Sequence, residues 1–457
     1  MYRKTGTGTL PDAQMPDTGE QERVMSYTWN QLGLRIPEIM LPKEGADYGK
    51  WAVVACDQYT SDPAYWQKAE EIVGGAPSTL RLMLPEFYLG KPDEEKRIVD
   101  IRSAMKAYVE QGTLRTLPKG CMLVRRTAEG RSRLGLVICV DLDAFDYRVG
   151  ASSLIRSTEK TIVERIPPRL KIRKGAMLEL PHILILIDDP DKSVIEPLEK
   201  AGGEVVYDTD LMLGGGHITG TFLSEEKMEG AREAMSALFD KAEQTYGTGK
   251  AMLMAMGDGN HSLATAKANW EEIKQQIPEE ERSTHPARYA LCELENIHDE
   301  GIVFEPIHRV LFADGKASGA QIIEETAAVL KEQSKDCQIA PKGTAAGEDQ
   351  FAIPVICADG EKVLLIDHPS SKIEVGALQN ALDLLVQEKG YRIDYIHGED
   401  AVRSLAAEEG NAGFLLPPMD KFLLFPAVAS DGALPRKTFS MGEAVEKRYY
   451  IEARSLV

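Results

Sequence analysis

The stretch from Ala251 to Ile273 constrains the fold more than any other part of the sequence. Met252 to Met256 form a short apolar run without charge, which is typical of a buried strand. The run ends in the turn 257–262, Gly-Asp-Gly-Asn-His-Ser, and apolar residues then recur at helical spacing, at Leu263, Ala266, Trp270 and Ile273. A strand, a glycine turn and a helix in immediate succession indicate a layered fold of the α/β (α+β) class.

This turn has the composition of an anion site. Glycines permit a sharp turn and close approach of a ligand, and a serine that caps a helix leaves the first helical N–H groups pointing into the turn. We therefore predict that phosphate is bound by Gly257, Gly259, Asn260 and Ser262, with Asp258 and His261 as candidate catalytic residues. The alternative is a plain turn, common in α/β proteins, in which His261 only holds the loop by hydrogen bonds.

An anionic ligand would need a local source of positive charge, because the chain carries a formal charge of -19 with a pI near 5.0. This charge argues against nucleic acid or an anionic membrane as a partner. Between Arg156 and Lys174, however, seven basic residues face only two acidic ones. We predict that this segment supplies the second half of a phosphate site through Arg156, Glu159, Lys160 and Arg169. The alternative is a solvated helix face paired with acids elsewhere.

A second polar strand end follows the apolar residues 51–56. Ligand groups often lie at strand ends in α/β proteins. Asp57 is therefore a candidate catalytic residue, and Gln58 and Tyr59 are candidate substrate contacts. The alternative is that Asp62 or its neighbour Ser61 merely caps a helix that has Pro63 in its first turn.

Four further features are candidates for the same site. His217 follows the glycine run 214–216, whereas His308 and Arg309 follow a proline within an apolar run. A proline in a strand marks an edge or bulge, where side chains are re-aimed. The basic segment 435–440 is expected to fold back toward the ligand.

The length of 457 residues suits two or three domains. We expect a flexible tail at 1–30, a domain at 31–275 that carries the turn, and a smaller α+β domain at 276–457. Six scattered cysteines without CxxC pairs, the lack of a signal peptide and the lack of any apolar run near the roughly 20 residues that span a bilayer favour a cytoplasmic protein without a membrane partner.

Several segments together resemble a known family. IRSTEKTIVERIPPRL, then GDGNHSLATAKA, then EPIHRV, and finally AGFLLPP with PRKTF occur in the order found in the domain-of-unknown-function 1015 family, over roughly Trp51 to Phe439. The resemblance implies a distant similarity to the ParB and sulfiredoxin-like superfamily, which includes a free-serine kinase. It also implies an N-terminal mixed-sheet domain of that type.

The family turn has the pattern Asp-Gly-His-His-Arg and, by the same resemblance, receives nucleotide phosphates. Asp258, Gly259 and His261 match this pattern, whereas Asn260 replaces the first histidine and Ser262 replaces the arginine. The replacement removes a bidentate phosphate donor, so the basic segment upstream must supply the charge.

Three functions are compatible with these residues. The leading hypothesis is a nucleotide-binding phosphotransferase, a small-molecule kinase that uses ATP or ADP with Mg²⁺ and acts on a hydroxylated metabolite. The runner-up is a non-catalytic nucleotide or anion sensor. The third is a metal-dependent hydrolase using His217, His261 and His308, but these lie 44 and 47 residues apart and give no zinc signature. The oligomeric state stays open, with a homodimer as one option.

Overall fold

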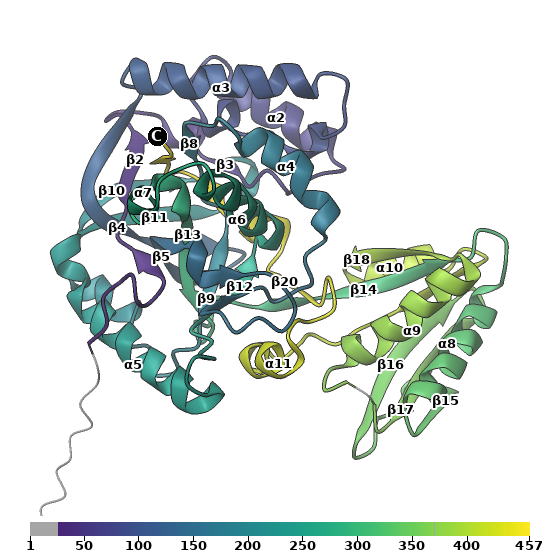
Figure 1. Ribbon diagram of the computed structural model, residues 1–457. Coiled ribbons are helices and arrows are strands. Elements are labelled where there is room, and N and C mark those ends of the chain that lie inside the picture. Colours follow the sequence, from purple (N-terminus) through teal and green to yellow (C-terminus); the bar gives the residue numbers. More distant parts are fainter. Residues whose placement is uncertain (1–25, 370) are drawn as a thin grey trace, which may run out of the picture.

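A large mixed sheet forms the centre of the computed structural model, which describes residues 26–369 and 371–457 (Figure 1). Within those residues the sheet has eleven strands, of which β12 pairs in parallel with β7 and antiparallel with β9. Its strand order is β10 (Glu204–Asp210), β11 (His217–Ser224), β4 (Leu114–Ala128), β5 (Arg131–Asp141), β13 (Tyr289–Asn296), β9 (Leu184–Ile187), β12 (Met254–Asp258), β7 (Ile155–Arg156) and β6 (Phe145–Asp146), with β1 (Leu34–Arg35) beside β5 and β2 (Glu38–Pro42) beside β4.

Both faces of this sheet are covered. Successive side chains of a strand point to opposite faces, and here both faces are apolar. On β4, Met122 and Val124 belong to one buried cluster, whereas Cys121 and Leu123 belong to the other. Helices α2 and α3 lie over the first face and α5 and α6 over the second (Figure 1). The helices of this unit are α1 (Tyr48–Trp51), α2 (Pro63–Val73), α3 (Glu94–Glu110), α4 (Ile166–Arg173), α5 (Glu229–Tyr246), α6 (Asn260–Lys274) and α7 (Glu279–Arg282).

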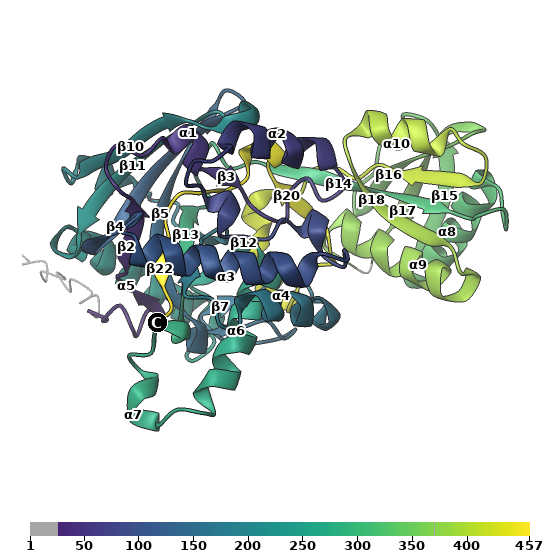
Figure 2. The same ribbon diagram turned by 90° about the horizontal axis from the view of Figure 1, so that it is seen from above.

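A smaller α+β unit lies at one end of the molecule and is reached through the long strand β14 (Figure 2). Its strand order is β15 (Asp336–Pro341), β17 (Gly360–Asp367), β16 (Gln350–Cys357), β19 (Asn411–Phe414), β14 (Phe304–Phe312) and β18 (Arg392–His397), with β20 (Phe439–Met441) on β14. Its helices are α8 (Gly319–Gln333), α9 (Glu374–Lys389), α10 (Glu399–Ala406) and α11 (Leu424–Asp431).

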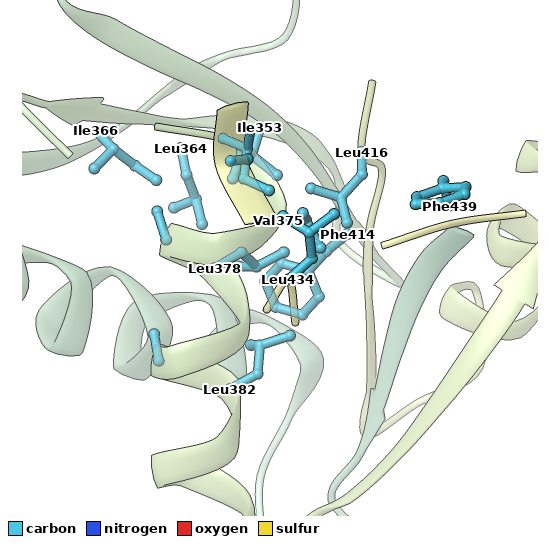
Figure 3. Packing of buried hydrophobic residues seen from close by; sticks show 14 of the residues in the cluster. Ile353, Leu364, Ile366, Val375, Leu378, Leu382, Phe414, Leu416, Leu434 and Phe439 are labelled. Carbon is cyan, nitrogen blue, oxygen red and sulfur yellow. The ribbon is translucent and has the colours of Figure 1, made fainter. Parts of the chain in front are cut away.

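The core of the smaller unit continues toward the large one. Leu378 and Leu382 of α9 pack against strand residues such as Ile353 and Phe414 (Figure 3). The same cluster includes Phe439, which stacks on Phe304 with ring centroids 3.9 Å apart. The two units therefore share apolar contacts at the base of β14.

The two sheets do not divide the chain at the expected boundary between residues 275 and 276. Strand β13 lies inside the large sheet, and the last residues of the chain return to the large unit. There β21 (Tyr449–Tyr450) pairs with β3 (Val53–Val54), and β22 (Arg454–Ser455) pairs with β8 (Leu178–Glu179). The fold class, α/β with a large mixed sheet and a smaller α+β unit, is confirmed.

The returning C-terminal segment carries a buried network of charges. Arg448 Nη1 lies 2.8 Å from Glu293 Oε2, and the same guanidinium pairs with Glu452, which accepts a hydrogen bond from Tyr207. Nearby, Arg133 Nε donates to Glu295 Oε1 at 2.6 Å. Burial raises the pKa of Glu295 to about 7, although Arg133 opposes the shift.

The start of the described chain is docked on α5. Tyr27 packs edge-on against Phe239, with ring centroids 4.7 Å apart, and its hydroxyl donates to Asp240 at 2.8 Å. The rest of the expected tail, residues 1–25, lies outside the described residues. Among residues 26–369 and 371–457, no helix combines the length and apolar character needed to cross a membrane.

Candidate functional site

The predicted turn lies in a cleft of about 790 Å³. The wall includes most of the residues predicted from sequence, drawn from three segments of the chain: Asp57, Gln58, Tyr59, Glu159, Arg169, Gly257, Asp258, Gly259, Asn260, His261 and Ser262. The C-terminal segment 437–447 closes the opposite side, as expected for the basic residues 435–440. Asp62 also accepts hydrogen bonds from Ala64 N and Tyr65 N, so it caps α2 beside the cleft.

Both glycines of the turn are required by its geometry. Gly259 has φ +81°, and a Cβ on Gly257 would lie 2.5 Å from the sulfur of Met441. Gly259, not Ser262, is the residue before the first turn of α6, and no side chain caps the helix. The N–H groups of Asn260 and His261 consequently have no acceptor among the described residues, and they remain available to a ligand.

Ser262 has a different partner from the predicted one. Its hydroxyl lies 2.8 Å from His182 Nε2, and His182 Nδ1 lies 2.9 Å from the hydroxyl of Tyr450. Tyr450 in turn accepts a hydrogen bond from Cys56 N at 3.2 Å. This chain of contacts links the turn to β21 and to the end of β3.

The upstream loop meets the turn directly. Ile155 pairs with Met254, and Ser157 Oγ donates to Asn260 Oδ1 at 2.6 Å. Five residues further along the loop, Ile162 N donates to His261 Nε2 at 3.3 Å. The two halves expected of the site are therefore adjacent.

His261 is a neutral ring in this environment. Burial lowers its pKa to about 4, and the charges of Arg165, Arg169 and Lys437 add to the effect. Because Nε2 accepts the hydrogen bond from Ile162, the neutral ring carries its hydrogen on Nδ1. His261 can therefore donate a hydrogen bond to a ligand, but its acceptor nitrogen is already engaged.

Two carboxylates of the cleft differ in their surroundings. Asp258 accepts from Gly259 N at 2.9 Å and lies 3.1 Å from Lys447 Nζ, and its pKa is lowered although burial opposes the shift. Burial instead raises the pKa of Glu159, only partly offset by the charge and N–H group of Lys437. Asp258 is thus a fixed anion, whereas Glu159 is the better proton acceptor.

The cations of the cleft fall into two groups. Lys447 pairs with Asp258, and Arg169 pairs with Glu86. Arg165 and Lys437 also line the cleft, and within the described residues neither side chain has an ion-pair partner. The buried hydroxyl of Thr158, in the same wall, also lacks a hydrogen-bond partner there. An anion in the cleft would satisfy these groups.

Two predicted members of the basic half do not reach the cleft. Arg156 is 6% exposed and donates to the carbonyls of Ser153 at 3.1 Å and Lys250 at 2.5 Å, so it stabilises the backbone around β7. Lys160 lines a separate cavity between residues 160–164 and α9. The basic residues without ion pairs that do line the cleft are instead Arg165 and Lys437.

The three remaining candidates also lie elsewhere. His217, on β11, is held between Asp208 and Asp210, and His308 is buried and accepts from Leu416 N at 3.1 Å. They do not converge with His261, which removes the basis of the hydrolase hypothesis. Within the described residues, no group of three or more His, Cys, Asp or Glu side chains is arranged to hold a metal.

Arg309 affects the cleft indirectly. It is fully buried, and its guanidinium donates to the carbonyls of Lys437 at 2.9 Å and Arg436 at 3.0 Å. Burial lowers its pKa to about 10. Arg309 therefore positions the segment that carries Lys437.

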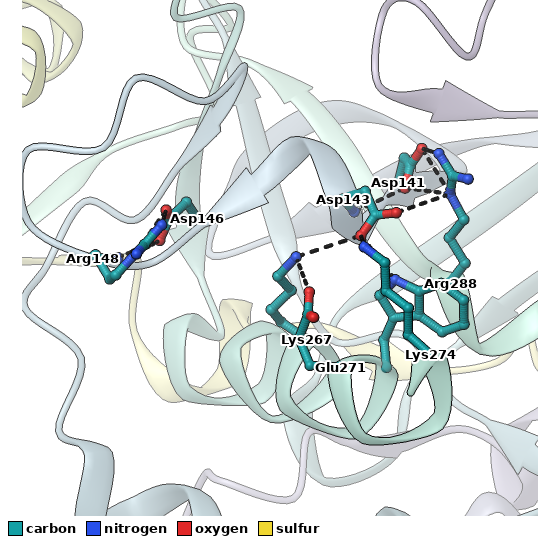
Figure 4. Close-up of polar contacts among 9 residues, drawn as sticks. Asp141, Asp143, Asp146, Arg148, Lys267, Glu271, Lys274 and Arg288 are labelled. Atoms are coloured by element: carbon teal, nitrogen blue, oxygen red, sulfur yellow. Dashed lines mark hydrogen bonds and ion pairs between the residues drawn. The ribbon is translucent and has the colours of Figure 1, made fainter. Parts of the chain in front are cut away.

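Acidic residues at the end of β5 and just after it anchor α6 and its surroundings. Asp143 Oδ1 accepts from Trp270 Nε1 at 2.9 Å and from Lys274 Nζ at 2.7 Å (Figure 4). Asp141 pairs with Arg288 at 2.6 Å. These contacts fix the far end of α6 and so hold its N-terminus in the cleft.

Sequence patterns did not single out Lys447 or His397, which also line the cleft. Lys447 stands in the mixed sequence GEAVEKRYY, where no spacing marks it as a ligand residue. Its place beside Asp258 depends on the pairing of β21 with β3.

The fold and cleft define a mixed α/β protein with a cleft between the glycine turn and the upstream loop. Residues 40–385 match the family described as protein of unknown function (DUF1015), and the chain belongs to this family. A comparison with curated proteins finds no significant match.

Three solved structures show a distant likeness. A conserved hypothetical protein from Pyrococcus furiosus is 11% identical, with a TM-score of 0.35 and coverage of 70% of this chain and 95% of that one. A free serine kinase mutant in complex with AMP is 10% identical, with a TM-score of 0.39 and coverage of 70% and 92%. SbnI from Staphylococcus aureus, truncated at its C-terminus, is 9% identical, with a TM-score of 0.34 and coverage of 70% and 81%. At these values the likeness says nothing of this chain's activity.

Proposed function

We propose that this protein is a nucleotide-dependent phosphotransferase that acts on a hydroxylated metabolite. The observation that carries the proposal is the convergence of unpaired donors on one cleft. Two cations without ion-pair partners, Arg165 and Lys437, line the same cleft as the free N–H groups at the start of α6. Phosphoryl transfer depends mainly on positioning and on stabilising the charge of the phosphoryl group, which such donors provide.

The phosphates would lie against the turn. The N–H groups of Asn260 and His261 would donate to phosphate oxygens, and His261 Nδ1 would add a neutral donor. Arg165 and Lys437 would neutralise the charge from the opposite side. Asp258 would hold Lys447 in place instead of contacting the phosphates, because its own negative charge would repel them.

In the proposed transfer step, Glu159 takes up the proton of the acceptor hydroxyl. The acceptor hydroxyl oxygen forms a bond to the γ-phosphorus while the bond from that phosphorus to the β–γ bridging oxygen breaks, and ADP leaves. The hydroxyl proton passes to the carboxylate of Glu159, whose raised pKa suits a general base.

A magnesium ion would enter with the phosphates, because Mg²⁺ at nucleotide sites usually takes one or two carboxylates together with phosphate oxygens. Asp57 fits this requirement, since it lines the cleft and makes no ion pair within the described residues. The ion would supply charge neutralisation at the β- and γ-phosphates.

The test is to titrate ATP, ADP and CTP calorimetrically and to measure ADP release with a panel of hydroxylated metabolites. Glu159→Gln should bind nucleotide like the wild type but transfer phosphate about 100-fold more slowly. Glu164→Gln, an exposed carboxyl in the same loop and outside the cleft, is the matched control. Failure of the folded wild type to bind any nucleotide would overturn the proposal, and binding without transfer to any metabolite would favour a nucleotide sensor.

A further inference from the structure

A second, smaller cavity opens beside the cleft. Its volume is about 140 Å³, and it shares four wall residues with the cleft: Glu86, Leu89, Arg169 and Ser262. Its inner wall is mainly apolar and includes Leu82, Leu84, Met105, Ile172 and Leu178. A molecule in the cleft could therefore extend an arm into this side cavity.

The polar groups of the side cavity are almost all engaged already. The carboxylate of Glu179 accepts from Arg173 at 2.6 Å and from Arg454 at 2.7 Å. The ring of His182 lies between Ser262 and Tyr450, with its two nitrogens 2.8 and 2.9 Å from their hydroxyls.

Two more polar side chains of this wall are engaged in the same way. Thr265 donates to the carbonyl of His261 at 2.7 Å, and Arg169 pairs with Glu86. Arg173 Nε is a fully buried donor of this wall that has no acceptor within the described residues. A water molecule needs two to four polar partners, so the interior favours an apolar occupant with at most one acceptor atom.

The size of the cavity indicates how large that occupant is. An apolar cavity of about 150 Å³ is known to accept benzene, so a ring of about six carbon atoms or a branched alkyl chain would fill this one. A nucleotide base is a poorer fit, because its edge carries several donors and acceptors that would stay unpaired here.

We infer that the side cavity binds the apolar arm of the acceptor substrate, an alcohol whose hydroxyl lies in the cleft and whose arm is an aromatic ring or a branched alkyl group. The inference rests on the proposed function, since the cleft must hold the nucleotide for the alcohol to lie beside it. It narrows the substrate from any hydroxylated metabolite to one with a compact apolar side group.

The experiment compares 2-phenylethanol with ethanol as probes, each titrated with and without ADP and each offered as an acceptor with ATP. The wild type should bind 2-phenylethanol at least about tenfold more tightly than ethanol, because a buried ring leaves water. Met105→Trp and Ile172→Trp fill the cavity from α3 and α4, and both should remove that preference while ADP binding is kept. Val109→Trp places the same side chain one turn further along α3, at a position that is 37% exposed and outside the cavity, and should change nothing.

Thermal melting identifies variants that fail to fold. Because the two Trp substitutions lie on different helices, one local folding defect does not explain a loss of preference in both. Equal binding of the two alcohols by the wild type would overturn the inference. Loss of ADP binding in both Trp variants, if they are well folded, would also overturn the inference, because the nucleotide base would then occupy the cavity. The proposed function would stand. The wild type could also bind 2-phenylethanol but not ADP, with both Trp variants losing the alcohol. That result would overturn the proposed function and still support an apolar side cavity.

Discussion

Two groups of basic side chains differ in their pairing and in their burial. Arg448 and Arg133 are buried and bound to Glu293, Glu452 and Glu295. Arg165 and Lys437 lie in the cleft without an ion-pair partner within the described residues. The first group is buried together with its own carboxylates, so its charges are already paired. A high density of positive charge is therefore a poor guide to an anion site unless the pairing is known.

The same difference in pairing predicts which substitutions lower the stability of the fold and which weaken ligand binding. Removing one partner of a buried pair leaves the other charge uncompensated in a medium of low dielectric constant. Removing an unpaired cation at the surface of a cleft leaves the folded chain almost unaffected but weakens a bound anion. The predictions below test this separation, and they run from the largest expected effect to the smallest.

Arg448→Met should cost about 3 to 5 kcal/mol in the free energy of unfolding, because Glu293 and Glu452 lose their shared partner. Urea unfolding at neutral pH measures the change. Arg165→Met is the matched control, with the same substitution at an unpaired arginine, and its unfolding curve should coincide with that of the wild type. Equal losses in the two variants would contradict the distinction between the groups.

Gly135→Ala should cost about 2 kcal/mol, because overpacking a filled interior displaces its neighbours. A Cβ at this position would lie 2.0 Å from Glu293 Oε1, and Glu293 cannot retreat without leaving Arg448. Gly230→Ala on α5, where a Cβ meets nothing within 4 Å, should instead be neutral or stabilising. A Gly135→Ala variant as stable as the wild type would show that the network is loosely packed.

Arg165→Met and Lys437→Met should each weaken ADP binding about tenfold, the effect of losing one charge-assisted hydrogen bond. Their melting temperatures should stay at the wild-type value. Lys160→Met removes a lysine from the same loop, but outside the cleft, and calorimetry should find its ADP affinity unchanged. A comparable loss in the Lys160 variant would indicate a long-range charge effect in place of contact.

His261 should make the protein less stable in acid. Its pKa is about 4 in the folded chain and near 6.5 when exposed, so as the pH falls from 6.5 to 4 the unfolded chain takes up the proton first. The stability that is fully present above pH 6.5 is lost in this window, by an amount on the order of 1 kcal/mol because the ring is only partly buried.

Urea unfolding of the wild type and His261→Gln at pH 7.5, 5.5 and 4.5 measures this loss. The difference between the two proteins removes the contribution of Glu295, whose raised pKa acts in the opposite direction. A constant difference over the whole range would contradict the lowered pKa of His261.

The elements with strong local periodicity were predictable from the sequence. The apolar run and turn form β12 and the start of α6. The sequence at 94–110 has an amphipathic pattern that predicts a helix, and α3 has these bounds. The pattern at 193–201 predicts a helix, but the structure has only a short 3-10 segment, Glu196–Lys200, because Pro197 interrupts the backbone hydrogen bonds of an α-helix.

The side chains of the cleft were less predictable than its elements. The sequence indicated that the upstream loop would meet the turn, and Ser157 and Ile162 make that contact. It could not indicate which basic residue of the loop faces the ligand, since an irregular segment has no period that assigns its faces. Arg156 was therefore predicted as a ligand residue and Arg165 was not, although Arg156 is buried among carbonyls and Arg165 is exposed.

The parts of the cleft are synthesised at different times, and the returning C-terminal segment is made after the others. The ribosome makes the turn at 257–262 long before Lys447, which holds Asp258, and before Tyr450, which reaches the turn through His182. Domains can begin to fold during synthesis, from the N-terminus onward. A nascent chain of this protein would therefore carry an incomplete cleft until residues 437–450 have left the ribosomal tunnel, and ligand binding would begin only after that segment has been made.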